Sequence, residues 1–104
     1  KNNMQIQFNY QHVSGSTELE NFTKEKLQVI ADRYSWVTRA DVFYRVENTE
    51  SKESGMIAEI RLSAPGPRLF AEESQSNFND AVSKVVNQLK TQCEKRKSEL
   101  IDHA

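Results

Sequence analysis

The chain has 104 residues, of which 37% are hydrophobic and 28% charged, a composition typical of one folded domain rather than of a disordered or membrane-spanning protein. Its 14 basic and 15 acidic residues give a formal net charge of −1, so a nucleic-acid-binding function would depend on how the basic residues are distributed. A single cysteine excludes an intramolecular disulfide, and no signal peptide is expected, so we predict a cytoplasmic protein.

The first third of the sequence predicts a strand followed by a helix. Residues 4–10 alternate apolar and polar side chains, as a half-buried strand does. The segment from Ser14 to Ser16 ends this strand, and Thr17 and Glu20 have the spacing of a capping box. Apolar residues then recur at helical spacing over residues 18–34, which predicts an amphipathic helix.

Three further strands and a second helix follow. Alternation predicts strands at residues 39–47, 56–62 and 68–73, with a hairpin loop at 48–55 and a tight turn at Pro65, Gly66 and Pro67. Ser76 or Asn77 is expected to cap the last helix, whose apolar stripe ends at Cys93. Residues 94–99 are almost all charged, so from about residue 94 we expect the helix to project beyond the domain or to fray.

This order, β-α-β-β-β-α, predicts an α+β fold in a single domain that spans residues 1–104. Strands joined by short connections pair antiparallel, whereas a helical crossover lets the first strand lie parallel to its neighbour. We therefore expect a four-stranded mixed sheet with both helices packed on one face. On the open face, Phe43, Ile57 and Phe70 would point outward and form an apolar patch.

No group of residues has the composition of a catalytic or metal site. The two histidines, His12 and His103, lack a cysteine or carboxylate at ligand spacing. Cys93 is expected to be a buried member of the helical stripe, and the neighbours Glu72 and Glu73 point to opposite faces of a strand. With three glycines, the chain has no phosphate-binding loop. We expect no enzyme, no cofactor, no metal and no small-molecule substrate.

The remaining indication of function is a concentration of basic residues in the last helix and on the strands. Between positions 84 and 97 the last helix carries five basic residues against one acid, Glu94, and the strands add three arginines. A helix flank and strand edges with this charge favour a surface that follows phosphates, although a solvated helix face is the alternative interpretation. The residues concerned are Lys84, Lys90, Lys95, Arg96 and Lys97 on the helix, and Arg39, Arg45 and Arg61 on the strands.

Two segments are similar to one known family. Residues 58–71 resemble the third strand, proline–glycine turn and fourth strand of ribosome hibernation-promoting factors and ribosome-associated translation inhibitors. The last helix, from residue 77 to its basic ending at residues 92–97, resembles the last helix of that family. With the order of elements, the resemblance covers residues 4 to about 100, and it implies the short form of the family and the same β-α-β-β-β-α fold.

The resemblance implies a cytoplasmic stress factor without enzymatic activity. Members of this family bind the small ribosomal subunit in the channel for messenger RNA and tRNA, inhibit translation, and protect idle ribosomes. Their contacts join basic side chains to 16S rRNA phosphates, so we expect this partner, no membrane, and a monomer away from the ribosome. Carried over by position, the RNA-binding residues implied are Lys26, Arg39, Arg45, Arg61, Lys95 and Lys97.

Two other functions stay open, because the sequence departs from the family pattern. Val29, Asp32 and Gln88 stand where the family commonly has lysines, and Asn79 where it has a tyrosine. One alternative is a protein-interaction module that keeps the fold, has lost rRNA binding, and uses the apolar patch. The other is a double-stranded-RNA-binding domain, since the last five elements have its α-β-β-β-α order, although residues 77–80 lack the lysines that such domains place there.

Overall fold

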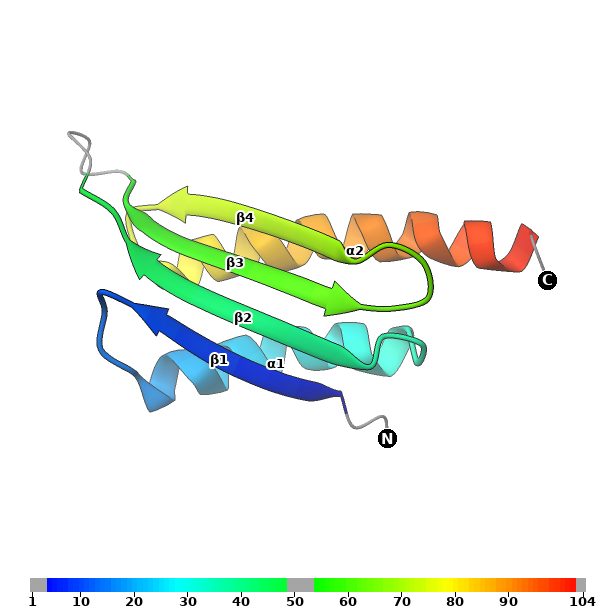
Figure 1. The fold of residues 1–104 in the computed structure, drawn as a ribbon, viewed down its shortest axis with the longest axis horizontal. Coiled ribbons are helices and arrows are strands. Elements are labelled where there is room, and N and C mark those ends of the chain that lie inside the picture. Colours follow the sequence, from blue (N-terminus) through cyan, green and yellow to red (C-terminus); the bar gives the residue numbers. More distant parts are fainter. Residues whose placement is uncertain (1–3, 49–53, 103–104) are drawn as a thin grey trace.

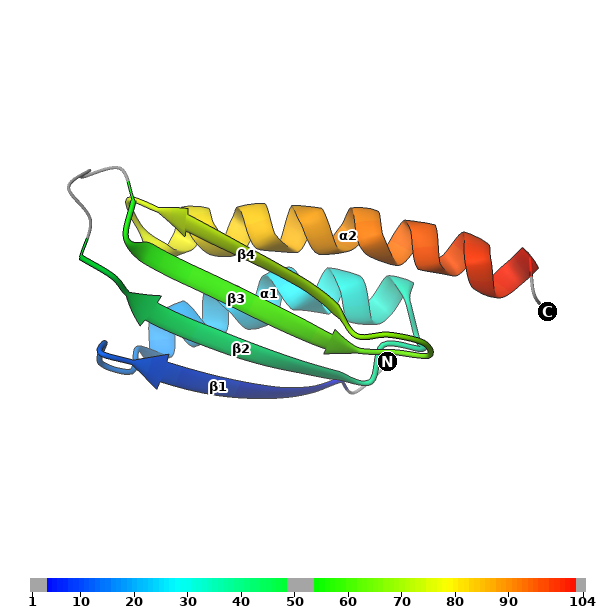
Figure 2. The same ribbon diagram turned by 45° about the horizontal axis from the view of Figure 1, so that its top comes forward.

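The structure is a computed structural model and describes residues 4–48 and 54–102 (Figure 1). Its elements are β1 (Gln5–Gln11), α1 (Thr17–Arg33), β2 (Arg39–Val46), β3 (Met56–Ser63), β4 (Leu69–Gln75) and α2 (Phe78–Asp102). The strands form one sheet in the order β1-β2-β3-β4, with β1 parallel to β2 and the other two pairs antiparallel. Both helices lie on the same side of this sheet (Figures 1 and 2), which confirms the predicted α+β fold.

The hydrophobic core fills the space between the sheet and the two helices. Alternate residues of β2 and β3, such as Val42 and Ile60, are fully buried because that side of each strand faces the helices. The helices contribute their apolar stripes, Leu27 and Ile30 from α1 and a longer run from Ala81 to Cys93 in α2. Burial of this stripe leaves the polar and basic residues of α2 on its solvent side.

A buried tyrosine joins α1 to the sheet. Tyr44 of β2 is completely buried, and its hydroxyl lies 2.5 Å from Oγ1 of Thr23 in α1. Because Thr23 Oγ1 already donates to the carbonyl of Leu19 at 2.9 Å, the Tyr44 hydroxyl is the donor in this pair. The Tyr44 ring also contacts the rings of Phe8 and Phe78, so a single residue connects β1, α1 and the start of α2.

The helix caps agree with the sequence prediction at α2 and differ at α1. Asn77 caps α2, since its Oδ1 accepts a hydrogen bond from the backbone N–H of Asp80 at 2.8 Å. The capping box predicted for Thr17 and Glu20 is wrong, because α1 begins one residue earlier. Ser16 is the N-cap, its Oγ accepts from the N–H of Leu19 at 3.2 Å, and Glu20 instead accepts from the Tyr10 hydroxyl.

Several element ends differ from the predicted ones. The fourth strand is β4 at Leu69–Gln75 instead of residues 68–73, β2 ends at Val46, and β3 continues to Ser63. Of the two outcomes predicted for α2 beyond residue 94, the structure has the projecting one: the helix continues to Asp102, and its last turns extend beyond the sheet (Figures 1 and 2). Residues 49–53 of the predicted hairpin loop lie outside the described residues.

The apolar patch predicted on the open face of the sheet does not form. Ile57 is only 5% exposed, so this part of the prediction is wrong. Its neighbours across the sheet are Arg45 and Ser74, and long polar side chains can shield an apolar one on the same face. Phe43 is half-buried, and of the three residues only Phe70, at 57%, is well exposed. The alternating pattern identified the side of the sheet on which each residue lies, but not whether neighbouring side chains shield that residue from solvent.

Candidate nucleic-acid interface

Four lysines on the solvent side of α2 are not held in salt bridges by carboxylates of the described residues. Lys84, Lys95 and Lys97 are exposed and Lys90 is half-buried. Their positions follow from the amphipathic helix, since the core takes the apolar stripe and leaves the lysines to solvent. We call these four residues the helix lysines.

Glu94, the one acidic residue between positions 84 and 97, is hydrogen-bonded to a tyrosine at the C-terminal end of α1. Glu94 accepts a hydrogen bond from the hydroxyl of the buried Tyr34 at 2.6 Å, which lowers the pKa of Glu94. The positive charges of Lys97 and Arg33 lower this pKa further, so Arg33 at the end of α1 lies near the basic end of α2. Sequence reasoning missed Arg33, although a basic residue in the last turn of a helix was a visible signal.

Arg96 holds a turn in place. Its Nη1 donates to the carbonyl of Pro65 at 2.5 Å, its Nε lies 3.6 Å from a carboxylate oxygen of Glu99, and its side chain is only 14% exposed. Two features favour glycine at position 66: its φ is +89°, and a Cβ there would lie only 3.0 Å from Arg96 Nη1. The turn between β3 and β4 is thus fastened to α2 by a residue predicted to contact RNA.

The predicted arginines of the strands lie on the open face, and each is paired with a carboxylate. Arg39 binds Asp41 at 2.9 Å, and this contact lowers the pKa of Asp41 against the opposing effect of burial. Arg45 contacts three carboxylates, and Arg61 Nε lies 2.6 Å from Glu59. The partners of Arg45 are Glu47, Glu59 and Glu72.

Sequence reasoning also missed Arg68, which binds Asp41 at 2.7 Å from the turn before β4. Arg68 was the first residue of the predicted fourth strand, and alternation with the outward-facing Phe70 could have placed it on the open face; in the structure it lies just before β4. Lys26 is exposed on α1, with its Nζ 5.4 Å from the centre of the Phe22 ring. The predicted site residues are therefore divided between the two helices and the ion-paired arginines of the strands. The helices lie on one side of the sheet (Figures 1 and 2), and the arginines lie on its open face.

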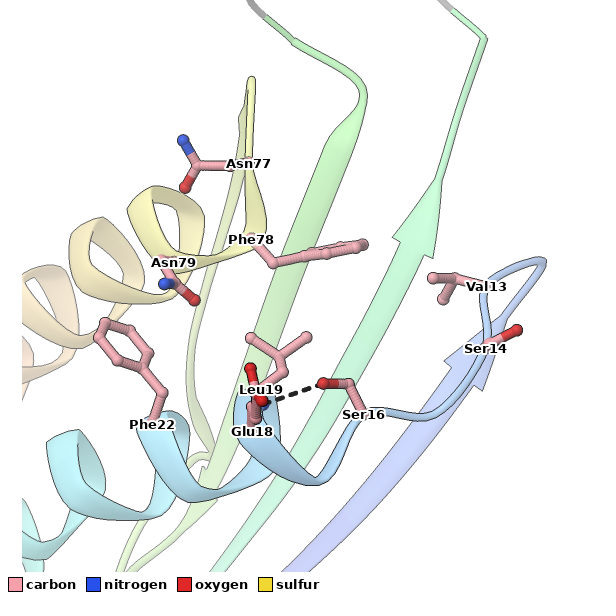
Figure 3. Close-up of a pocket in the computed structure, with 9 residues that line it drawn as sticks. All are labelled: Val13, Ser14, Ser16, Glu18, Leu19, Phe22, Asn77, Phe78 and Asn79. Carbon is pink, nitrogen blue, oxygen red and sulfur yellow. Dashed lines mark hydrogen bonds between the residues drawn. The ribbon is translucent and has the colours of Figure 1, made fainter.

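Two of the surface hollows formed by the described residues bear on ligand binding. One of about 520 Å³ lies between the N-terminal ends of α1 and α2 (Figure 3). Apolar Leu19, Phe22 and Phe78 and polar Glu18 and Asn79 are among its lining residues, all of which are neutral or acidic. This hollow therefore offers no cationic side chain to a phosphate. The other, of about 320 Å³, lies on the open face and is lined by Glu59, Arg61, Arg68 and Phe70.

The histidine, cysteine and carboxylate side chains of the described residues do not form a metal site. Within residues 4–48 and 54–102, no group of three or more His, Cys, Asp or Glu side chains could hold a metal ion. His12 is exposed, and His103 lies outside the described residues. Cys93 is buried, as the helical stripe predicted, and burial raises the pKa of its thiol to about 11. No helix found among these residues is long and apolar enough to cross a membrane.

Comparisons with known proteins agree with the resemblance seen in the sequence. Two curated proteins from Pseudomonas putida, each named ribosome hibernation promoting factor, are 26% identical to this chain over 94 residues, which cover 90% of this chain and 87% of each relative. A ribosomal subunit interface protein from Coxiella burnetii has a TM-score of 0.79 at 23% identity, covering 91% of this chain and 99% of that one.

The N-terminal domain of Thermus thermophilus Protein Y shares the fold as well, with a TM-score of 0.74 at 19% identity over 88% of this chain and 98% of that one. The model of one protein family, described as sigma 54 modulation protein / S30EA ribosomal protein, matches residues 6–101. Because this match spans nearly all of the sequence, the chain belongs to the sigma 54 modulation protein / S30EA ribosomal protein family, the family of ribosome hibernation factors that its strands, turn and last helix resemble.

Proposed function

We propose that this protein binds the small ribosomal subunit in the channel for messenger RNA and tRNA, inhibits translation there, and stabilises idle ribosomes. The family membership and the names of the relatives support a ribosome-associated role. In this proposal the protein is a cytoplasmic factor with one domain at residues 1–104 and no enzymatic activity. It is a monomer away from the ribosome, and its main partner is 16S rRNA.

The helix lysines are the observation that carries this proposal. RNA phosphates attract lysines whose charge is not already balanced, and each phosphate contact releases counterions from the RNA. Lys84 and Lys95 lie on one flank of the solvent side of α2, and Lys90 and Lys97 lie on the other flank. The final turns of this helix, which carry Lys95 and Lys97, project beyond the sheet (Figure 2). The molecule is elongated, 48 by 25 by 17 Å, so this basic end can reach into an RNA groove before the body of the domain meets it.

We propose different roles for the remaining predicted contacts. Lys26 and Arg33 on α1 add positive charge on the helical side of the molecule. Arg39, Arg45 and Arg61 must exchange a carboxylate for a phosphate or contact RNA through their exposed edges, so they contribute less per residue. Arg96 contributes mainly by holding the turn at Pro65.

Sedimentation with ribosomes and isolated small subunits across a salt series tests the proposal. We expect the wild-type protein to pellet with small subunits at low salt, and Lys95→Glu and Lys97→Glu each to pellet less. Lys24→Glu is the matched control, because it reverses one exposed charge on α1 outside the proposed contacts. Absence of binding at every salt concentration, or an equal loss in the control, would contradict the proposal.

The two alternatives predict different outcomes in the same preparation. A double-stranded-RNA-binding domain would shift plain duplex RNA in a gel, but α2 begins with Asp80 in its first turn, which repels phosphate. A protein-interaction module would retain its partner at high salt. Because the apolar patch does not form, that module would have Phe70 as its main exposed apolar contact on the sheet.

A further inference from the structure

The open face of the sheet is turned toward the reader in Figure 1. It carries a row of aromatic and guanidinium groups from β2, β3 and β4. Arg61 of β3 is the direct cross-strand partner of Phe70 in β4. On its other side, the Arg61 guanidinium carbon lies 4.8 Å from the centre of the Phe43 ring in β2. The hollow of about 320 Å³ opens beside this row, between Arg61, Arg68 and Phe70.

Phe70 is presented to solvent from a fixed backbone. The residue is 57% exposed, so its ring is accessible to a ligand. Gln92 of α2 donates from Nε2 to the carbonyl of Phe70 at 2.9 Å, and β3 pairs along the other side of the strand. The ring is therefore a preorganised flat surface rather than part of a loose loop.

The polar groups of the hollow are two arginines, which donate, and one carboxylate. Its carboxylate, Glu59, already accepts hydrogen bonds from both Arg45 and Arg61. Arg61 uses its Nε in that contact and Arg68 uses one terminal nitrogen for Asp41, which leaves N–H groups on both arginines directed to solvent or the hollow. Their side chains are 45% and 52% exposed, so a ligand can reach them.

The charges of this face are balanced, which distinguishes it from the helical side. Its four arginines face an equal number of carboxylates, so it has no excess charge with which to follow a phosphate backbone. The arginines are Arg39, Arg45, Arg61 and Arg68, and the carboxylates are Asp41, Glu47, Glu59 and Glu72. Such a surface suits a flat, neutral group that stacks and accepts hydrogen bonds.

We propose that this hollow binds one unpaired nucleobase of single-stranded RNA, stacked on Phe70 beside Arg61. Bases stack on phenylalanine and on guanidinium planes, and arginine donates to the O6 and N7 acceptors of guanine, so guanine is the preferred base. A tryptophan of a protein partner fits less well, because its indole N–H would meet further donors. The proposal goes beyond phosphate binding by the helix lysines and does not depend on the ribosome as target.

The probe is a fluorescently labelled six-nucleotide single-stranded RNA with one internal guanine, measured by fluorescence anisotropy against the same RNA with an abasic site at that position. We expect the guanine RNA to bind more tightly, and Phe70→Leu to weaken its binding about 5- to 100-fold, in line with the loss of one base–aromatic stack. Phe70→Tyr keeps a ring and should keep most of the affinity. Val29→Ala removes another exposed apolar side chain, on α1, and should change nothing.

Guanosine monophosphate followed by NMR locates the contact. We expect shifts of the Arg61 Nε–H and Phe70 amide signals in the wild type that vanish in Phe70→Leu, while circular dichroism stays unchanged. Equal binding of guanine and abasic RNA, or unchanged binding in Phe70→Leu, would overturn the proposal. A tryptophan-containing peptide that shifts these signals, with guanosine monophosphate inactive, would overturn it in favour of a protein partner.

The two proposals fail in distinguishable ways. Suppose that the wild type pellets with small subunits but binds guanine and abasic RNA equally, with the same affinity in Phe70→Leu. In that case the nucleobase site is wrong and the proposed function stands. If guanine RNA binds through Phe70 but small subunits are never pelleted, the nucleobase site stands and the ribosomal function is wrong.

Discussion

Removing two helix lysines should change the salt dependence of ribosome binding by a calculable amount. The logarithm of affinity falls with the logarithm of salt concentration by about 0.7 to 0.9 for each neutralised phosphate. Lys95 and Lys97 have no salt bridge in the described part of the structure, so each is available for one full phosphate contact. The double variant Lys95→Ala/Lys97→Ala should therefore have a slope smaller by about 1.5.

This difference is large enough to measure. Between 50 and 200 mM salt, the affinities of both proteins fall. With a slope change of about 1.5, the factor by which the wild-type affinity falls is about eight times the factor for the variant. The assay is a binding titration of small subunits at four or more salt concentrations. Alanine is a strong helix former, and both side chains are exposed, so the variant should fold and unfold as the wild type does.

An ion-paired arginine provides the sharpest control. Arg45 is already surrounded by carboxylates, so Arg45→Gln should leave the slope nearly unchanged. Lys24→Ala serves as the control for loss of one exposed positive charge on α1. The reasoning is refuted if the double variant keeps the wild-type slope, or if Arg45→Gln lowers the slope as much per residue as the lysine substitutions do.

Three further predictions concern the fold. In urea unfolding, Tyr44→Phe should lower the free energy of unfolding by about 1 kcal/mol, and Thr23→Val by more, about 1–3 kcal/mol, because it leaves the buried Tyr44 hydroxyl without its acceptor; equal effects would contradict this asymmetry. Because Arg39 lowers the pKa of Asp41, the carboxylate stabilises the fold above its ordinary pKa, and this stabilisation is lost as pH falls through the lower pKa of the folded state. The difference in unfolding free energy between wild type and Asp41→Asn should therefore shrink below about pH 4, and a constant difference from pH 7 to 3 would show the assignment to be mistaken. Since burial raises the pKa of Cys93 to about 11, the thiol should react with a disulfide reagent at pH 8 only after urea is added; rapid labelling of the native protein would mean that α2 opens at this point.

Local patterns in the sequence were sufficient to predict the elements and their arrangement. Period-two alternation identified the buried side of β2 and β3, and the helical stripe ending at Cys93 identified the buried side of α2. Connection length then predicted which strands pair parallel and which antiparallel. The cap of α1 was misplaced by one residue because both Ser16 and Thr17 carry a suitable hydroxyl.

The candidate site could be predicted only in part. The charge of a residue can be read from the sequence, but the carboxylate that pairs with it can come from a distant part of the chain. The sequence identified the basic residues of α2 and of the strands, and the solvent side of each. It could not show that Arg45 meets Glu72 from 27 positions away, or that Glu94 is held by Tyr34 from 60 positions away.

The sequence by itself determined the order of elements, their buried faces and the list of cationic side chains, since these depend on spacing along the chain. The tertiary structure decided which of those cations are balanced by carboxylates, which aromatic side chains are covered, and that Arg61 lies between Phe43 and Phe70. These properties depend on distances between strands and helices, and such distances exist only once the sheet register and the helix packing are set.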